Sequence, residues 1–369
     1  MTIQELDTPS LLIDREILMD NLRYMQAYAD RNHVALRPHT KTHKMPEIAK
    51  LQEKLGACGI AVAKVGEAEV MAQQGLKDIL IANEIVGIQK LERICRLAES
   101  GVKIAFGVDS PCQVEAAEEV FANASRPAQV MVEIEVGENR SGIIWEADFI
   151  ELLDAIRRCP HVRFQGLFSH DGNSYSAANL EECREIARGA QRRTLHFADL
   201  AKEQGMAPET VSFGSTPSLM NQFEILEGIT ELRPGTYCLM DASQGHAIGT
   251  LDRCAATVLA TVISRPTDER VILDVGAKGL TMQGRDVGIC ATPGKGTLLE
   301  YPDVHIHGVY DEHAIIYNAK FREKVQVGDR VRIIPVHICP VCNLYDEAYL
   351  VSGNEVVGKI PVLARGKLQ

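Results

Sequence analysis

Titratable side chains are concentrated in one short segment near the start of the chain. Residues 37–44 read RPHTKTHK, whereas the whole chain is acidic, with 39 basic and 50 acidic residues. A lysine in such a segment can form a Schiff base with a carbonyl compound, and positive neighbours lower its pKa. The segment offers two lysines for that role, Lys41 and Lys44, although a single lysine is more often a solvated surface residue.

A second segment is small and polar. Residues 213–218 read FGSTPS, which offers backbone N–H groups and hydroxyls to an anion such as phosphate. The same letters are also typical of an ordinary helix start, with Ser215, Thr216 or Ser218 as the cap and Pro217 just inside. A phosphate site together with a Schiff-base lysine would fit pyridoxal phosphate.

A third segment contains soft metal ligands. His337 and Cys339 lie two positions apart in PVHICPVC. If this segment is a strand, both side chains point to the same side and can bind one metal ion. Imidazole with thiolate favours Zn²⁺, and two ligands favour an open site over a closed structural one. Buried thiols beside a hydrogen-bonded histidine would give the same spacing, and Cys342 completes a CxxC pair without a thioredoxin-like context.

Eight β-branched runs alternate with longer amphipathic segments and must position these groups. We predict strands at 34–36, 59–63, 78–83, 103–108, 129–135, 163–168, 210–213 and 236–240. Strand and helix repeated eight times predict a (β/α)₈ TIM barrel, whose functional groups lie after the strands. RPHTKTHK, VGENRSG, SHDGNSY and GSTPS follow the first, fifth, sixth and seventh strands, and LRPGTY comes just before the eighth.

The pattern changes after Asp241. Short β-like runs separated by Gly, Pro and Asp replace the helical period, which predicts a C-terminal all-β domain. We therefore expect an α/β barrel domain over residues 1–241 and a β domain that carries the metal pair over residues 242–369. The run SLLID at 10–14 precedes the barrel and could pair with either domain.

The composition excludes several classes of partner. The chain has 369 residues and a formal charge of −11, which argues against nucleic acid as a ligand. We find no apolar run long enough for a membrane span and no signal peptide at the start. The ten cysteines form no spaced framework, so we expect reduced thiols and a cytoplasmic location.

Six motifs, taken in order, resemble one family. TPSLLID, RPHTKTHK, VEIEVGENRSG, GSTPS, RPGTY and HICPVCN look like the D-serine dehydratase and D-threonine aldolase group, over residues 8–366. These are fold-type III pyridoxal-phosphate enzymes related to alanine racemase. The resemblance implies an alanine-racemase-like barrel followed by a β domain. It also implies a homodimer with the active site at the subunit interface.

The resemblance assigns roles to individual residues. It implies that Lys41, and not Lys44, holds pyridoxal phosphate and acts as the base for the α-proton. Arg140 would lie by the phenolic oxygen of the cofactor. We expect Arg37 and His39, which flank Lys41, to position it or to lower its pKa.

The remaining implied roles concern phosphate and metal. The phosphate would be bound by Gly214, Ser215 and Thr216, with Gly235 and Tyr237 beside them. The metal ligands would be His337 and Cys339, for Zn²⁺ or for Mn²⁺ or a similar ion.

The motifs also distinguish between reactions. GSTPS, SHDGNSY and His-x-Cys are similar to those of the dehydratases, which implies loss of water and ammonia from a D-β-hydroxy amino acid such as D-serine or D-threo-3-hydroxyaspartate. D-Threonine aldolase is the alternative, with His170 as a candidate base, although a hydrogen-bonded structural role fits His170 equally. A racemase or a non-catalytic cofactor carrier fits less well. Phe168 stands where relatives often carry Tyr, which leaves open how the pyridine nitrogen is held.

Overall fold

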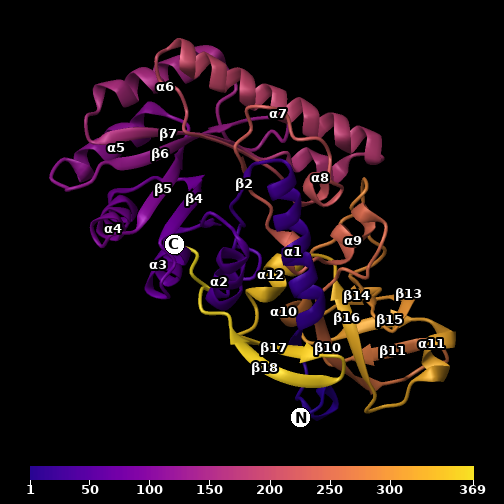
Figure 1. Ribbon diagram of the computed structural model, residues 1–369. Helices are drawn as coiled ribbons and strands as arrows, with labels where there is room; N and C mark the ends of the chain where they lie inside the picture. The colour runs from indigo at the N-terminus through magenta and orange to yellow at the C-terminus, as the bar shows by residue number, and fades with distance from the viewer.

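A computed structural model describes residues 1–369, and its strands form two sheets (Figure 1). The first sheet has eight parallel strands in the order β2-β9-β8-β7-β6-β5-β4-β3. Parallel order with helical crossovers is what the alternating sequence pattern predicts. The strands are β2 (Ala35–Leu36), β3 (Ile60–Val62), β4 (Asp78–Glu84), β5 (Lys103–Val108), β6 (Ala128–Ile134), β7 (Val162–Ser169), β8 (Thr210–Phe213) and β9 (Glu231–Leu232).

Backbone hydrogen bonds join the two end strands of this sheet. The Cys58 amide donates to the Leu36 carbonyl at 2.9 Å, and the Ala61 amide donates to Pro38 at 2.8 Å. The Thr40 amide donates back to Ala61, also at 2.8 Å. The chain between β2 and Lys41 therefore forms the seam that curls the sheet into a barrel, and the predicted barrel fold is confirmed.

The predicted position of the eighth strand is wrong. The run 236–240 begins with the short helical turn η3 (Thr236–Cys238), and the strand is β9, where Glu231 pairs with Ala35 and Leu232 with Leu36. A short buried apolar run has no period that separates strand from helix. As a consequence RPGTY follows the eighth strand, so Arg233 and Gly235 lie at the same end of the barrel as Lys41.

Helices cover the outside of the barrel (Figure 1). Their ends carry the expected signals: Gly56 ends one of them at φ 121°, and Ser110 caps another while Gln113 accepts from its amide. The helices are α2 (Pro46–Leu55), α3 (Val65–Gln73), α4 (Ile88–Glu99), α5 (Pro111–Phe121), α6 (Glu146–Arg158), α7 (Leu180–Glu203) and α8 (Thr216–Met220), with the turn η2 (Gly172–Ser176) before α7.

The second sheet has ten strands and incorporates the N-terminal segment. Strand β1 (Ser10–Asp14) pairs antiparallel with β10 (Ala256–Ser264) and parallel with β17 (Glu347–Ser352). Helix α1 (Arg15–Arg31) then leads the chain to the barrel. The other strands are β11 (Arg270–Leu273), β12 (Gly296–Leu298), β13 (Tyr301–His305), β14 (Gly308–Val309), β15 (Ala314–Tyr317), β16 (Arg330–Pro335) and β18 (Glu355–Pro361).

The sequence predicted an all-β C-terminal part, but the structure also contains helices there. Four short helices interrupt the strands. Helix α9 (Ala242–Ile248) directly follows the barrel sequence, and α12 (Ile338–Cys342) contains the cysteine of the metal motif. The others are α10 (Ala277–Leu280) and α11 (Ala319–Lys324), and the turn η1 (Ile3–Glu5) precedes β1. Helices of four to seven residues give too few repeats for a detectable period. A domain boundary at Asp241 stays a prediction.

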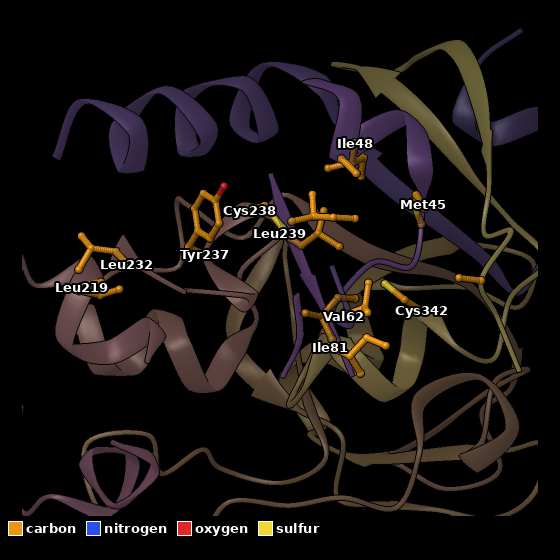
Figure 2. Close-up of a cluster of buried hydrophobic side chains, with 14 of the residues drawn as sticks. Met45, Ile48, Val62, Ile81, Leu219, Leu232, Tyr237, Cys238, Leu239 and Cys342 are labelled. Carbon is orange, nitrogen blue, oxygen red and sulfur yellow. The ribbon is translucent and has the colours of Figure 1, made fainter. Parts of the chain in front are cut away.

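One hydrophobic cluster runs from the barrel into the second sheet. Figure 2 shows Cys342 of α12 in the same cluster as Val62 of β3 and Ile81 of β4. Because apolar contacts are continuous across the junction, α12 packs directly onto the barrel. No helix in the structure is long and apolar enough to span a membrane.

Arg37 lies inside the barrel and not at the active-site end, which corrects the expectation that it positions Lys41 or lowers its pKa. Its Nε donates to Glu231 Oε2 at 2.7 Å, and its Nη1 donates to Asp78 Oδ1 at 2.7 Å. Glu231 and Asp78 begin strands β9 and β4, so the guanidinium points to the N-terminal end of the barrel. Inward-facing residues alternate along a barrel strand, and Arg37 takes an inward position.

The buried Arg37–Glu231 pair leads to a prediction on stability. We expect Glu231→Gln to lower the free energy of unfolding by about 3 kcal/mol, because it leaves a buried guanidinium short of a counter-charge. Asp78→Asn should cost less, since the Asp78 side chain is 27% exposed against 4% for Glu231. Urea unfolding of both variants measures the difference, and equal losses would contradict this order.

Candidate active site

A cavity of about 540 Å³ lies at the end of the barrel where the strands finish, and loops and α12 from the C-terminal part of the chain complete its walls. This volume is typical of a site for a small molecule. The barrel supplies most of the charged groups and α12 closes one side. The lining includes fifteen residues with ionisable or aromatic side chains: His39, Lys41, Lys44, Lys64, Glu67, Glu133, Glu138, Arg140, Phe168, His170, Tyr175, Arg233, Arg285, His337 and Cys339.

Lys41 follows the barrel seam and lines this cavity. Burial lowers the pKa of Lys41, and the nearby guanidinium groups of Arg140 and Arg233 lower it further, although Cys339 has the opposite effect. The Lys41 amide donates to His39 Nδ1 at 3.4 Å, so the ring hydrogen of neutral His39 is on Nε2. Lys41 therefore presents an amine whose neutral form is favoured, as a nucleophile or base requires.

Lys44 also lines the cavity, but its ammonium group is already paired. Nζ lies 3.0 Å from Glu67 Oε1 and donates to Asn343 Oδ1, also at 3.0 Å. Both side chains of the ion pair are almost fully buried. Lys44 thus joins α3 to the segment after α12, and the two lysines of the motif have different environments.

Arg140 is held at the cavity by carboxylates. Its guanidinium lies 3.4 Å from Glu133 and 3.3 Å from Glu138. Burial raises the pKa of Glu84 to about 8, and the adjacent Glu133 carboxylate adds to the shift. Glu84 therefore stays protonated, whereas the neighbouring Glu133 stays ionised beside Arg140.

Phe168 and Arg233 form one wall together. Phe168 is the last residue but one of strand β7 and is 2% exposed, and the Arg233 guanidinium carbon lies 5.1 Å from its ring centroid. Arg233 is held by bonds to the Ser212 hydroxyl at 2.6 Å and the Ser169 carbonyl at 2.7 Å. Burial lowers the pKa of Arg233 to about 10. Arg233 belongs to the RPGTY motif, but the sequence alone predicted no role for it.

His170 lines the cavity in its neutral form. Burial lowers the pKa of His170 well below its usual value, and the charge of Lys41 adds to this effect. Its Nδ1 lies 3.0 Å from the Gly214 carbonyl, which only accepts hydrogen bonds. The ring hydrogen is therefore on Nδ1, and Nε2 is a hydrogen-bond acceptor.

The GSTPS turn brings hydroxyls and free amides to the cavity. Ser215 and Thr216 line it, as does Gly235 after β9. The backbone amides of Gly214, Ser215 and Gly235 donate no hydrogen bond within the chain. A side chain at position 235 would approach the His39 carbonyl to 3.2 Å, so glycine keeps this edge open. Such a set of donors suits a phosphate.

Tyr237 does not reach this group of donors. It is 1% exposed, and its hydroxyl accepts from Gln52 Nε2 at 3.1 Å. Figure 2 shows Tyr237 in the hydrophobic cluster with Leu232 and Leu239. The predicted contact of Tyr237 with the phosphate is therefore wrong, because η3 turns the side chain into the core.

A buried carboxyl group supports the turn from behind. The Ser218 hydroxyl donates to Asp171 at 2.6 Å and lies 2.8 Å from the Ser215 hydroxyl. Burial raises the pKa of Asp171 to about 7, although the serine hydroxyls act in the opposite direction. The sequence could not show this chain of hydroxyls, because Asp171 and Ser218 are 47 residues apart.

His337 and Cys339 both line the cavity, but they are not on a strand. Strand β16 ends at Pro335, and His337 occupies the position just before α12, which contains Cys339. The predicted geometry is thus wrong, although both side chains still line the same cavity. Cys342, one turn further along α12, is fully buried in the hydrophobic cluster and does not line the cavity.

Asp241 orients the metal-binding motif. Its Oδ2 lies 3.2 Å from His337 Nδ1 and accepts from the Ile338 amide at 3.0 Å. With Nδ1 bonded to a carboxylate, His337 Nε2 is left for another partner, which is how histidine ligands are commonly oriented. Burial raises the pKa of Cys339, but His337, Thr42 and Thr236 outweigh it and bring the pKa to about 7.

The donor set fits the two groups that the resemblance implies. Lys41, the free amides of the GSTPS turn and the Phe168 face are suited to a phosphorylated aldehyde with an aromatic ring. An imidazole and an ionisable thiol are suited to Zn²⁺. No group of three or more His, Cys, Asp and Glu side chains is arranged for a metal, so two protein ligands would leave an open site.

Two family models match the chain. Residues 13–243 match the alanine racemase N-terminal domain, and residues 255–351 match the putative serine dehydratase domain. A D-threonine aldolase from an Arthrobacter species is 36% identical over 99% of this chain and 94% of its own length. The crystal structure of D-threonine aldolase from Filomicrobium marinum is 30% identical, with a TM-score of 0.89 over 100% of this chain and 98% of that one.

A dehydratase is equally similar in structure. D-threo-3-hydroxyaspartate dehydratase from Delftia sp. HT23 is 27% identical, with a TM-score of 0.89 over 98% of both chains. Two further structures of that dehydratase replace a histidine and a cysteine two positions apart, and the cysteine variant is in a metal-free form. With matches over both parts of its length, this chain belongs to the alanine racemase N-terminal domain family, in the branch that carries the serine dehydratase domain.

Proposed function

We propose that this chain is a pyridoxal-phosphate- and metal-dependent lyase that eliminates water from D-β-hydroxy-α-amino acids. The products would be a 2-oxo acid and ammonia. The observation that carries elimination is the His337 and Cys339 pair at the cavity. A D-threo-3-hydroxyaspartate dehydratase has a histidine and a cysteine with the same spacing, and its cysteine variant was solved in a metal-free form.

The proposed cofactor contacts come from the cavity wall. Lys41 would hold the aldehyde carbon, and Ser215, Thr216 and Gly235 would bind the phosphate through hydroxyls and free amides. Gly214 does not line the cavity, but it precedes Ser215 and would add its free amide. His337 Nε2 and Cys339 Sγ would hold the metal. When bound, pyridoxal phosphate draws electrons from the Cα–H bond of the substrate, and a divalent cation polarises its β-hydroxyl group.

Lys41 is the proposed base for the α-proton. Its pKa is lowered by burial, which favours the neutral amine that can accept a proton. Arg140 and Arg233 add to this effect, and Arg140 would also lie by the phenolic oxygen. Lys44 is unsuited to the task, because its ammonium group is bonded to Glu67 and Asn343. His39, bonded through Nδ1 to the Lys41 amide, would position the turn that carries Lys41.

Phe168 and Arg233 bear on how the cofactor ring is held. Phe168 offers an apolar face but no hydrogen bond. Arg233 lies against that face and is fixed by Ser212 and Ser169, so a guanidinium donor is available at the same wall. We propose Arg233 as the polar group that faces the cofactor ring, in place of the hydroxyl that a tyrosine at position 168 would supply.

Retro-aldol cleavage to glycine and an aldehyde is the second candidate. Two of the similar proteins are D-threonine aldolases, one of them 36% identical to this chain. The neutral His170 has a free Nε2 at the cavity, where it could accept the β-hydroxyl proton that this reaction must remove. Both reactions use the same substrate class and the same metal position.

Product analysis separates the two candidates. We expect the purified holoenzyme to convert D-serine, D-threonine or D-threo-3-hydroxyaspartate to a 2-oxo acid and ammonia, with no turnover of the L-enantiomers. Removal of the metal with EDTA should lower the rate by at least about 100-fold, because hydroxide is a poor leaving group without a Lewis acid. Added Zn²⁺ should restore it.

Two results would contradict this proposal. Glycine and an aldehyde as the main products would support the aldolase candidate. An unchanged rate after rigorous metal removal would exclude the metal role of His337 and Cys339.

We also propose a homodimer with the active site near the interface. Met282 and Val287 are 60% and 65% exposed and flank Arg285, which lines the cavity. Exposed apolar side chains around a cavity commonly mark an interaction surface. Light scattering should give twice the mass of one chain, and Val287→Asp should shift it toward one chain; a wild-type monomer would contradict the proposal.

A further inference from the structure

Arg285 reaches the cavity from the second sheet's side of the molecule. It is carried by a loop that folds back on itself, since the Thr292 amide donates to the Arg285 carbonyl at 2.8 Å. The loop is attached to the barrel next to η2, where the Ile289 amide donates to the Ala177 carbonyl at 2.7 Å. Gly288 permits this approach, because a Cβ there would lie 2.4 Å from the Ser176 backbone.

The Arg285 guanidinium lies over an aromatic ring and has no ionic partner. Its central carbon is 4.7 Å from the Tyr175 ring centroid. Its buried Nε has no hydrogen-bond partner, and no carboxylate forms an ion pair with it. An arginine stacked on a ring keeps its edge donors free for a planar anion such as a carboxylate.

Three other guanidinium or ammonium groups at the cavity are already engaged by the protein, whereas Lys64, which also lines it, forms no ion pair. Lys44 is paired with Glu67, Arg140 is paired with Glu133 and Glu138, and Arg233 donates to a hydroxyl and a carbonyl. Lys41 has its proposed task at the cofactor. A buried donor without a partner is costly, so the Nε of Arg285 is suited to a group that enters with a ligand.

Arg285 lines the same cavity as Lys41 and the metal pair. Tyr175, the residue on which Arg285 stacks, also lines this cavity, and its ring centroid lies 6.2 Å from that of His170. A substrate whose α-carbon is at Lys41 and whose β-hydroxyl is at His337 and Cys339 would leave its β-substituent in this same space, where the Arg285 guanidinium has no ionic partner.

We infer that Arg285 binds a second carboxylate beyond the β-carbon, so that this enzyme acts preferentially on β-hydroxy amino dicarboxylates of the 3-hydroxyaspartate type. This inference rests on the proposed function for the orientation of the substrate. The group that Arg285 binds is a carboxylate. A dicarboxylate substrate has two, one on its α-carbon and one on its side chain, and we assign the side-chain carboxylate to Arg285.

Binding of unreactive amino acids tests the inference without turnover. D-Aspartate has the second carboxylate and D-alanine lacks it, and neither has a β-hydroxyl group to eliminate. Calorimetry of the holoenzyme should show that Arg285→Gln weakens D-aspartate binding roughly 10- to 100-fold, the range for a hydrogen-bonded charged group. D-Alanine binding should stay at the wild-type level, which also shows that the site is folded.

Two variants serve as controls. Arg285→Lys keeps the charge but loses the planar fork, so it should restore D-aspartate binding only in part. Lys278→Gln removes one positive charge from an exposed ion pair with Glu312, outside the cavity lining, and should change neither affinity.

Three results would overturn the inference. Equal weakening of both ligands would mean that Arg285 holds the α-carboxylate. Unchanged affinity of Arg285→Gln for D-aspartate would exclude contact with the second carboxylate. If Lys278→Gln weakened D-aspartate binding as much as Arg285→Gln does, long-range charge and not a direct contact would explain the effect. Failure of every β-hydroxy substrate to react would contradict the proposed function alone, because the binding comparison still decides the role of Arg285.

Discussion

The fully buried carboxylate of Asp241 connects the two parts of the candidate site. One oxygen accepts from the Gln244 amide and caps α9, the first helix after the barrel. The other accepts from Ile338 and lies against His337, so it caps α12 and orients the imidazole with one interaction. Apolar packing of α12 on the barrel then fixes the helix against the strand ends. Because a buried carboxylate must be satisfied by donors, the geometry of the metal pair depends on the same bonds as the junction between the two sheets.

The cationic side chains around the cavity also differ in whether the protein supplies a carboxylate partner. Lys44 and Arg140 are bonded to carboxylates, whereas Lys41 and Arg285 are not, although all four line one space. The residue type alone does not tell the paired cations from the unpaired ones. The difference depends on which loop faces each strand end. The paired cations hold the site together, and the unpaired ones are free to bind a ligand.

The barrel could be predicted from the sequence, because long amphipathic helices and buried strands such as 103–108 have clear periods. The eighth strand and α12 could not, since runs of two to five residues have none. Motif order placed Lys41, His170, Ser215 and Cys339 at one cavity. Motif order misplaced Arg37 and Tyr237, although nearby residues of the chain line the cavity. The Arg37 side chain points into the barrel, and the Tyr237 side chain points into the hydrophobic core. Arg285 and Asp241 gave no usable pattern, because their roles arise from contacts between distant segments.

The central claim is that one lysine of RPHTKTHK, Lys41, carries the cofactor, and spectroscopy tests it most directly. Purified wild-type protein with pyridoxal phosphate should show the visible absorbance of a lysine-bound cofactor, and borohydride should fix the label on one peptide. Lys41→Ala should lose both the absorbance and the label, whereas Lys44→Ala, which removes an ion pair with Glu67, should keep them. Loss of the label in Lys44→Ala with retention in Lys41→Ala would contradict the account.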